Sequence, residues 1–380
     1  MHTQGEKPKI LILGGYGNFG KRICATLAKD PHLHIIVAGR DLKKAETLAQ
    51  EIKQKNHHTH IQGLMLDWKA QDFSQKLRES QADILIHAAG PFQNQLYTVA
   101  EACIDNKMHY IDLSDGREFV VNIKQLDEKA KLNNVAVISG ASSVPGLSSV
   151  IVHTFADKFA ILREIDFGIA PANKIERGDA TITAILGYTG RPFQRLENGS
   201  WKTVYGWQNL HRHYYGDNLG LRWHGNCDIP DLVLLPELYP TLKTVVFHAG
   251  LEVTAMHFIL WQMSWLTRAK IIKNWAFFNK PIIALSRLFD RFGTEAGGMY
   301  VRLRGSNHRY QPLEITWNCI AEQGDGPYIP TIPSLILVDK LLKAEIAPGA
   351  RPCVRMFSLQ DFERFATFWH IYYTIEEIES

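Results

Sequence analysis

Short apolar runs alternate with amphipathic segments over the first 140 or so residues of the chain. The apolar runs are typical of buried strands and cover 9–15, 33–40, 61–68, 82–92, 109–114 and 135–141. The segments between them have helical periodicity and cover 20–30, 41–55, 71–81, 95–106 and 119–133. This alternation predicts βαβ units and an α/β fold, with a parallel sheet covered by helices on both faces.

The rhythm changes after about residue 150, which predicts a second domain of mixed α+β type. Strands are expected at 164–174 and 179–190, and a hairpin at 297–306 and 312–323. The stretch 203–240 is rich in aromatic residues and predicts loops. Helices are expected within 258–292 and at 334–346, while the tail 362–380 fits either a strand or an amphipathic helix.

A glycine-rich turn joins the first strand to the first helix. The sequence GGYGNFG, residues 14–20, fits GxGxxG in the context that this motif needs, between a strand and a helix. Early glycines allow a tight turn and close approach of the backbone to a pyrophosphate, and the last lets the helix pack near the strand. We therefore predict a doubly wound sheet of Rossmann type that binds a dinucleotide. The predicted contacts in this turn are Gly14, Gly15, Gly17, Asn18, Phe19 and Gly20.

The second strand indicates which dinucleotide is bound. An NAD site usually has an acidic residue about 20 positions after the glycines, gripping the ribose 2′-hydroxyl. Here Gly39 stands at that position and Arg40 follows it, and a guanidinium suits a 2′-phosphate. The sequence thus favours NADP(H) over NAD(H); in the alternative, Arg40 is solvated and Asp41 binds the ribose. Asp67 ends the third strand, where it either contacts the adenine or serves as a turn residue.

Composition excludes several classes of protein. The chain has 380 residues, 46% hydrophobic and 21% charged, with a formal net charge of +3. That balance gives no basic patch for nucleic acid. The five cysteines are scattered and odd in number, without a CxxC pair, so we expect buried thiols in a cytoplasmic protein. No signal peptide or membrane-spanning run is expected.

The fourth strand leads into the most distinctive stretch of the chain. GGYGNFG, AGR, AAGPFQNQLYTVAEACIDNKMHYIDLSDGREFV, GASSVPGLSS and GDGPYIPTIPS together resemble the saccharopine dehydrogenase-like family of NAD(P)-binding oxidoreductases. The resemblance implies hydride transfer between NADP(H) and a C–N or carbonyl centre of a small, amino-acid-like substrate. It also implies a dinucleotide-binding domain at 1–145, a substrate and dimerisation domain at 146–325, a segment from about 325 to 380 returning to the first domain, and a homodimer.

Further site residues follow the fourth and fifth strands. Small residues after the fourth strand would let the chain pass under the ribose and nicotinamide, and the predicted contacts are Ala89, Gly90, Pro91 and Phe92. Asp112 and Asp115 lie at the end of the fifth strand, where doubly wound sheets bind ligands. We predict Asp112 as a cofactor or substrate contact and Asp115 as an acid or base; in the alternative, both stabilise turns.

Other polar residues give weaker signals. Arg177, Arg191 and Arg222 are of the type that binds a substrate carboxylate. His211 and His213 share one face of an extended segment, but neither an HxxxH motif nor a carboxylate partner is evident in the sequence, so no metal is predicted.

The stretch 258–292 combines aromatic and basic residues. It is interpreted as a core or interface helix with its charges outward. The alternative is peripheral contact with a membrane surface. In that second view the protein keeps the nucleotide fold but has little or no catalysis.

Overall fold

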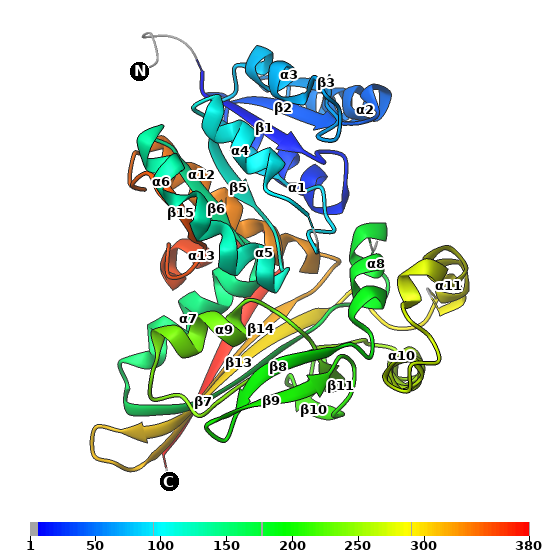
Figure 1. Ribbon diagram of the computed structural model, residues 1–380, viewed down its shortest axis with the longest axis vertical. Helices are drawn as coiled ribbons and strands as arrows, with labels where there is room; N and C mark the ends of the chain where they lie inside the picture. Colours follow the sequence, from blue (N-terminus) through cyan, green and yellow to red (C-terminus); the bar gives the residue numbers. More distant parts are fainter. Residues whose placement is uncertain (1–6, 94, 176–177, 290, 380) are drawn as a thin grey trace. The chain divides into compact units, whose positions relative to one another are not determined.

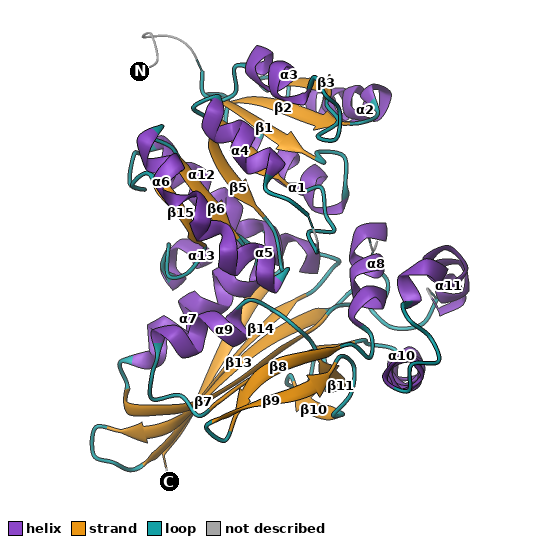
Figure 2. Cartoon of the chain, viewed as in Figure 1, coloured by secondary structure: helices purple, strands orange, loops and turns teal. Residues whose placement is uncertain are grey.

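The computed structural model describes residues 7–93, 95–175, 178–289 and 291–379. The chain forms two compact units. Unit 1 comprises residues 1–146 and 330–357, and unit 2 comprises residues 147–329 and 358–380. Figure 1 shows the elements, and Figure 2 shows helices and strands in separate colours. Of the C-terminal segment expected to return to the first domain, residues 330–357 lie in unit 1 and residues 358–380 in unit 2.

Unit 1 is built on a seven-stranded sheet in the order β15-β6-β5-β4-β1-β2-β3. Every neighbouring pair in it is parallel. The strands are β1 (Lys9–Leu13), β2 (His34–Gly39), β3 (His60–Met65), β4 (Ile84–His87), β5 (His109–Asp112), β6 (Ala136–Ser139) and β15 (Gly349–Pro352). The predicted α/β fold with a doubly wound parallel sheet is confirmed.

Helices cover both faces of this sheet, so its central strands are buried throughout. They are α1 (Asn18–Leu27), α2 (Leu42–Lys55), α3 (Phe73–Ser80), α4 (Thr98–Asp105), α5 (Arg117–Asn122), η1 (Ile123–Leu126), α6 (Asp127–Leu132) and α12 (Ile332–Leu342), with short helical turns η2 (Ser143–Leu147) and η5 (Gly326–Thr331) at the unit boundaries. Ile10, Leu11 and Ile12 of β1 are fully buried. Each such side chain contributes about 1.5–3 kcal/mol of apolar burial, which explains the unbroken apolar runs in the sequence.

Unit 2 contains a second seven-stranded sheet, in the order β10-β11-β12-β7-β13-β14-β16, and a separate β8–β9 hairpin. Strands β12 and β7 are parallel, and the other neighbours are antiparallel. The strands are β7 (Phe159–Ala170), β8 (Pro192–Glu197), β9 (Ser200–Tyr205), β10 (His211–Tyr214), β11 (Leu221–Asn226), β12 (Thr244–Gly250), β13 (Gly297–Asn307), β14 (Pro312–Ala321) and β16 (Ile371–Glu379). The predicted second domain of mixed type and the β13–β14 hairpin are thus confirmed.

The helices of unit 2 include one surprise. They are α7 (Ser148–Ala156), α8 (Asp179–Tyr188), α9 (Asp231–Leu238), α10 (Thr254–Arg268), η3 (Trp275–Phe278), α11 (Asn279–Ser286), η4 (Arg287–Phe289) and α13 (Leu359–Ala366). The strand predicted at 179–190 is wrong, because α8 packs against η3 and α11 and these contacts outweigh the β preference of its Thr and Ile residues.

Two further expectations need correction or completion. The stretch predicted as loops, 203–240, contains β10, β11 and α9. The undecided tail forms both elements, a helix (α13) and then an edge strand (β16).

All five cysteines are buried thiols, as predicted. Among the helices in the described ranges, none is both long enough and apolar enough to cross a bilayer.

Candidate functional site

The glycine-rich turn between β1 and α1 is so tight that side chains would not fit at its ends. Gly14 has φ of +83°, and a Cβ there would lie 3.0 Å from the backbone nitrogen of Ala89. A Cβ on Gly20 would overlap the carbonyl oxygen of Gly14. The first glycine therefore permits the turn and the last permits close packing of α1, which are the roles that a dinucleotide-binding turn requires.

The N-terminus of α1 presents open backbone donors. Its N-cap is Gly17, which offers no side-chain acceptor. Within the described chain no acceptor is found for the N–H groups of Asn18, Phe19 and Gly20, since intrahelical bonding begins at Lys21. Arg22 donates to the carbonyl oxygen and side-chain oxygen of Asn18, at 2.6 and 2.5 Å, which brings a cation to this end of the helix. Such a terminus attracts phosphate.

The end of β2 lies beside this turn and holds the predicted specificity residue. The Asp41 backbone N–H donates to the Tyr16 hydroxyl at 3.0 Å, and the Tyr16 ring covers Gly39 so closely that a Cβ there would clash. Asp41 Oδ1 accepts from the Lys44 backbone N–H and caps α2. Because this carboxylate oxygen is already engaged while Arg40 is exposed, the arrangement favours Arg40 over Asp41 for contact with a ribose substituent.

Sequence reasoning missed a basic hollow next to Arg40. A cavity of about 470 Å³ is lined by Tyr16, Lys21, Asp41, Lys43, Lys44, Thr47, Leu48 and Glu51. Its three lysines come from the first turns of α1 and α2 and outnumber its two carboxylates, Asp41 and Glu51, so the lining carries a net positive charge that suits a phosphate. The pairing of Arg40 with two lysines after it, in RDLKK, was the signal in the sequence.

Asp67 lies close to the same strand end. The Leu66 backbone N–H donates to the Gly39 carbonyl oxygen at 2.9 Å, which holds Asp67 next to the end of β2. Asp67 is half-buried and its Oδ1 accepts from the Lys69 backbone N–H at 3.1 Å. This is the turn role weighed as the alternative, and the predicted adenine contact stays a prediction.

The stretch after β4 closes the other side of the glycine turn. Ala89 contacts Gly14, and Gln95 Nε2 donates to the carbonyl oxygens of Ala89 and Pro91, at 3.2 and 2.7 Å. Gly90 is half-buried and Pro91 is exposed. Phe92 instead points inward: it is 5% exposed, with its ring 4.9 Å from that of His87. Its side chain therefore supports this loop from beneath.

Asp112, at the end of β5, is fully buried. Its Oδ1 accepts hydrogen bonds from the Ser114 backbone N–H, the Ser139 hydroxyl and the Gly140 backbone N–H, at 2.9, 3.0 and 2.8 Å. Burial raises the pKa of Asp112 to about 6, against these hydrogen bonds, which act in the opposite direction. The carboxyl thus joins the loops after β5 and β6, which is the turn-stabilising role weighed as the alternative, and the predicted cofactor or substrate contact stays a prediction.

Asp115 differs from Asp112 in exposure, although desolvation by the surrounding protein also raises the pKa of Asp115. It is exposed, and its Oδ1 accepts from Gln93 Nε2 at 3.2 Å. The two acidic residues singled out in the sequence therefore differ in exposure, since the Asp115 side chain reaches the surface and that of Asp112 is buried.

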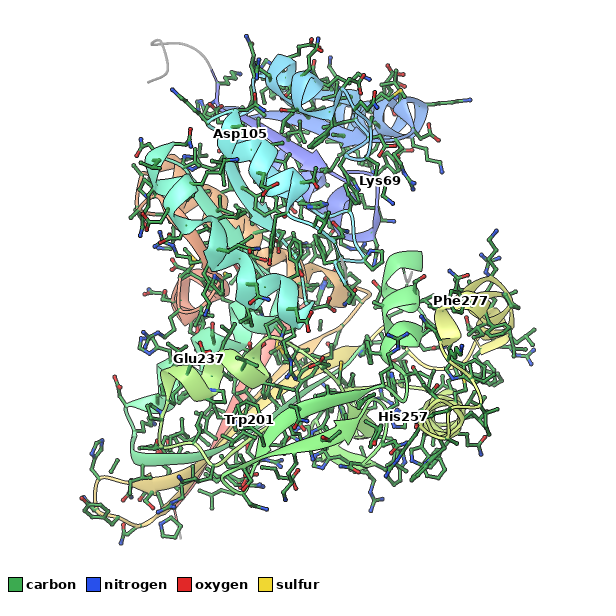
Figure 3. All side chains as sticks on the ribbon, in the orientation of Figure 1. Lys69, Asp105, Trp201, Glu237, His257 and Phe277 are labelled. Atoms are coloured by element: carbon green, nitrogen blue, oxygen red, sulfur yellow. The ribbon has the colours of Figure 1, made fainter. Side chains whose placement is uncertain are left out.

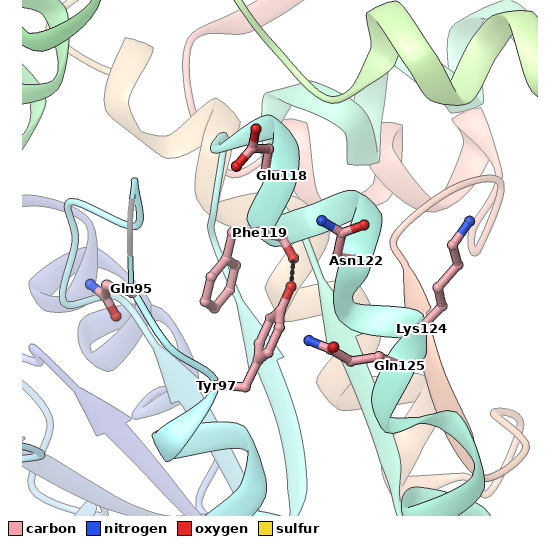
Figure 4. Close-up of a pocket in the computed structure, with 7 residues that line it drawn as sticks. All are labelled: Gln95, Tyr97, Glu118, Phe119, Asn122, Lys124 and Gln125. Atoms are coloured by element: carbon pink, nitrogen blue, oxygen red, sulfur yellow. Dashed lines mark hydrogen bonds between the residues drawn. The ribbon is translucent and has the colours of Figure 1, made fainter.

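A second cavity of unit 1 lies beside these loops. It measures about 430 Å³ and is lined by Gln95, Tyr97, Glu118, Phe119, Asn122, Lys124 and Gln125 (Figure 4). The Tyr97 hydroxyl donates to the Phe119 carbonyl oxygen at 2.7 Å. The same Phe119 ring lies 5.4 Å from that of Phe92, so the cavity adjoins the loop after β4.

Unit 2 contains a separate polar cluster around Asp166 of β7. Its Oδ1 accepts from the Tyr300 hydroxyl at 2.8 Å and lies 3.3 Å from His248 Nδ1, and its Oδ2 lies 3.8 Å from His211 Nε2. Burial would raise the pKa of Asp166, but the neighbouring His248, His211 and Tyr300 outweigh it and hold that pKa below its usual range. Burial lowers the pKa of His211, which favours its neutral form.

This cluster corrects one inference from the sequence. His211 does have a carboxylate partner, Asp166, brought to it by the order of the strands. The ligand atoms of Asp166, His211 and His248 lie within 4.8 Å of one another, so they could hold a metal ion. Tyr300 and Arg302 already engage the carboxylate, the latter at 3.5 Å, and the absence of a metal stays a prediction.

The arginines expected to bind a substrate carboxylate differ in exposure and in ion pairing. Arg222 is 15% exposed and forms an ion pair with Glu252 at 3.0 Å, so its charge is already matched. Arg191 is exposed, and Arg177 lies outside the described residues.

Comparison with known proteins identifies the N-terminal part of the chain. Residues 10–138 match the family model described as saccharopine dehydrogenase NADP binding domain. The resemblance seen in the sequence is confirmed over these residues, and so is the assignment of NADP(H) to this domain. A search of curated protein sequences finds no match to the chain.

Solved structures extend the likeness in fold to the whole chain. Apo saccharopine dehydrogenase (L-Glu forming) from Saccharomyces cerevisiae matches with a TM-score of 0.66 and 12% identity, covering 98% of this chain and 100% of that one. The homospermidine synthase from Legionella pneumophila, in complex with NAD, matches with a TM-score of 0.60 and 12% identity, covering 97% of this chain and 92% of that one. At this identity the comparison shows a shared fold.

Proposed function

We propose that this chain is an NADP(H)-dependent oxidoreductase that transfers a hydride to or from a C–N or carbonyl centre of a small, amino-acid-like substrate. The observation that carries the proposal is the Gly14–Gly20 turn, which lies in a domain matched to an NADP-binding family and leaves no room for side chains at its two ends. The fold is shared with both named structural neighbours over more than nine tenths of each chain, and the yeast neighbour is a saccharopine dehydrogenase that forms L-glutamate.

The residues present suit the cofactor. The open N–H groups of Asn18 to Gly20 would hold the pyrophosphate, and Arg40 with Lys43 and Lys44 would hold the 2′-phosphate. Ala89 and Gly90 would lie along the ribose and nicotinamide, where small residues are needed. When bound, NADPH supplies the hydride, and the protein contributes orientation and a proton.

Asp115 is our proposed proton donor or acceptor. Reduction of an imine or carbonyl adds a hydride to carbon and a proton to nitrogen or oxygen, so an exposed acid near the strand ends is required. Asp115 is exposed, and Gln93 orients it through the 3.2 Å hydrogen bond. Asp112 positions the loop that carries it, since Asp112 Oδ1 accepts from the Ser114 backbone N–H.

We also propose that the enzyme acts in the cytoplasm as a homodimer. The buried thiols of the five cysteines suit a reducing compartment. Dimerisation rests on the family resemblance and is tested by light scattering of the purified protein.

A substrate screen tests the proposed activity. NADPH oxidation is followed by absorbance with L-glutamate, other amino acids and small aldehydes or 2-oxo acids, singly and in pairs. We expect turnover with at least one pair that can form an imine, or with one carbonyl compound alone. Asp115→Asn should then lower kcat by about 100-fold while NADPH binding is kept. Asp30→Asn, on an exposed turn after α1, is the matched control and should leave both unchanged. Turnover unaffected by Asp115→Asn would remove this residue from the mechanism.

A further inference from the structure

Residues 254–292 of unit 2, here called the basic aromatic segment, expose many large apolar side chains. The segment comprises α10, η3, α11 and η4. Phe277 is 80% exposed and Leu288 is 63% exposed, far more than packing residues usually are. The other exposed large apolar side chains of the segment are Ile259, Trp265, Leu266, Ile271, Phe278, Leu285 and Phe292. Exposed apolar surface of this extent marks an interaction site rather than an ordinary surface.

One face of α10 attaches the segment to the sheet. Its buried residues are His257, Leu260 and Ser264, and the His257 ring lies 5.5 Å from that of Trp207. The η3, α11 and η4 elements have no buried residue among those described. In Figure 3, His257 is labelled at α10, close to the strands, and Phe277 at η3, beyond α8. The apolar residues of the outer helices are therefore left uncovered within this unit.

The segment is also strongly cationic. Its sequence has Arg268, Lys270, Lys273, Lys280, Arg287 and Arg291, and a single acidic residue, Asp290. Four of these cations, Lys270, Lys273, Lys280 and Arg287, are exposed. Arg268 instead packs on the Tyr205 ring at 4.2 Å and fixes the end of α10.

The charge decides which partner fits. In a two-fold symmetric dimer the same patch meets itself, so a second copy docked here would bring these cations against one another. An anionic partner with an apolar interior avoids that repulsion. A bilayer containing acidic phospholipids offers both, because apolar side chains enter the acyl boundary while Lys and Arg remain at the headgroups.

We propose that the basic aromatic segment binds the surface of a membrane that contains anionic phospholipid. Phe277 and Leu288 enter the interface, and Lys273 and Lys280 contact the headgroups. This function goes beyond hydride transfer and does not depend on it, since the segment shares no residue with the dinucleotide site.

Co-sedimentation with lipid vesicles tests the proposal. The full chain is mixed at low salt with phosphatidylcholine vesicles, either pure or containing about 30% phosphatidylglycerol. We expect pelleting with the anionic vesicles, little with the neutral ones, and release on adding salt. Equal pelleting with both vesicles, or none with either, would overturn the proposal. The protein could instead bind neither type of vesicle and form a dimer, measured by light scattering, that dissociates when exposed residues of the basic aromatic segment are replaced. In that case the segment is a protein interface and the proposal is wrong.

Two double variants separate the apolar and ionic contributions. Phe277→Ala with Leu288→Ala removes exposed apolar surface, and Lys273→Gln with Lys280→Gln removes charge. Each should lower the vesicle partition coefficient at least about tenfold. The matched control is Leu132→Ala with Tyr310→Ala, which removes side chains 86% and 75% exposed elsewhere on the chain and should bind as wild type. Variants of the basic aromatic segment that pellet like this control would contradict the proposal. An unchanged melting temperature and an unchanged NADPH titration verify that each variant is folded.

Discussion

Gly14 and Ala89 meet through their backbones, so that a Cβ on Gly14 would lie 3.0 Å from the Ala89 nitrogen. This contact joins the turn after β1 to the end of β4, its neighbour in the sheet. Strand order reverses between these two strands, because β2 and β3 lie on one side and β5, β6 and β15 on the other. Doubly wound sheets bind ligands at such a point, outside the carboxyl ends of the strands. The geometry that needs glycine is thus located where a dinucleotide would bind.

The two glycines at positions 17 and 20 should respond differently to alanine. In Gly20→Ala the new Cβ overlaps the Gly14 carbonyl oxygen, so α1 must move, and we expect a loss of about 1–3 kcal/mol in the free energy of unfolding. In Gly17→Ala the new Cβ meets only the Gly14 oxygen, at 3.1 Å, and φ is −73°, so the fold should be kept.

NADPH affinity separates these effects. Gly17→Ala adds a methyl group where the backbone must approach the pyrophosphate, so we expect at least about tenfold weaker binding with little change in melting temperature. Calorimetric scans and titrations on both variants measure the two quantities. A Gly17→Ala protein that binds NADPH like wild type would show that the pyrophosphate does not lie over this turn.

Arg40→Ala should weaken NADPH binding by at least about tenfold and leave NADH binding unchanged, because only NADPH has the 2′-phosphate. The matched control is Lys53→Ala. Lys53 is an exposed cation in the last turn of α2 and does not line the basic hollow. Fluorescence titration with both cofactors gives the two affinities. Equal losses for NADPH and NADH would mean that Arg40 does not bind the 2′-phosphate.

The raised pKa of Asp112 predicts how the free energy of unfolding depends on pH. Burial raises its pKa to about 6 in the folded protein, above the value near 3.9 of an unfolded chain. Between those values the folded state binds more protons than the unfolded state, so this group's contribution to stability falls as pH rises from about 4 to 6. Asp112→Asn cannot titrate, while its side-chain oxygen still accepts the three hydrogen bonds. As pH rises through this window, the free energy of unfolding of the variant should therefore increase by about 1–3 kcal/mol relative to that of wild type.

Urea unfolding of both proteins at several pH values measures that difference. Above about pH 6 the two curves should run parallel, since wild-type Asp112 is then ionised in both states. A difference that is constant from pH 4 to pH 7 would show that the Asp112 pKa is not raised.

Asp166→Asn should destabilise unit 2 by about 1–3 kcal/mol at pH 7, because it removes the charged acceptor of the Tyr300 hydroxyl and one of the two carboxylates that face Arg302, which keeps Glu314 at 3.3 Å. The pKa of Asp166 is held below its usual range, so its stabilising effect is complete above the unfolded value near 3.9 and is lost as pH falls through the folded value. The variant and wild type should therefore converge in strongly acidic solution.

Glu164→Gln on the same strand is the matched control. It breaks a more exposed ion pair with Arg304, at 2.9 Å, and should lower the free energy of unfolding by less than about 1 kcal/mol. Scanning calorimetry compares the two variants. If both variants melt alike at pH 7, the Asp166 cluster contributes no more than a surface ion pair.

Much of unit 1 could be predicted from local patterns. Fully buried strands such as β1 and β4 appear as unbroken apolar runs, and the glycines of the turn mark positions where a Cβ would clash. Asp41, which directly precedes α2, is also of the residue type that caps helices, and its side chain accepts from the Lys44 N–H. These features depend on neighbours close in sequence.

Features that depend on distant neighbours escaped prediction. Helix α8 contains β-favouring residues, and its helical state comes from packing on η3 and α11, far along the chain. His211 meets Asp166 because the order β10-β11-β12-β7 brings their strands together. The Tyr16 hydroxyl contact with Asp41 likewise requires β1 and β2 to be adjacent. Burial of Asp112 results from the packing of the loops after β5 and β6 around it, which no periodicity in the sequence indicates.

The central claim is that unit 1 binds NADP(H) through the Gly14–Gly20 turn and Arg40. Calorimetric titration of the purified chain with NADPH and with NADH tests it most directly. The account predicts one NADPH per chain, bound at least about tenfold more tightly than NADH. Equal affinity for the two cofactors would contradict the role of Arg40, and no binding of either would contradict the assignment of the dinucleotide site itself.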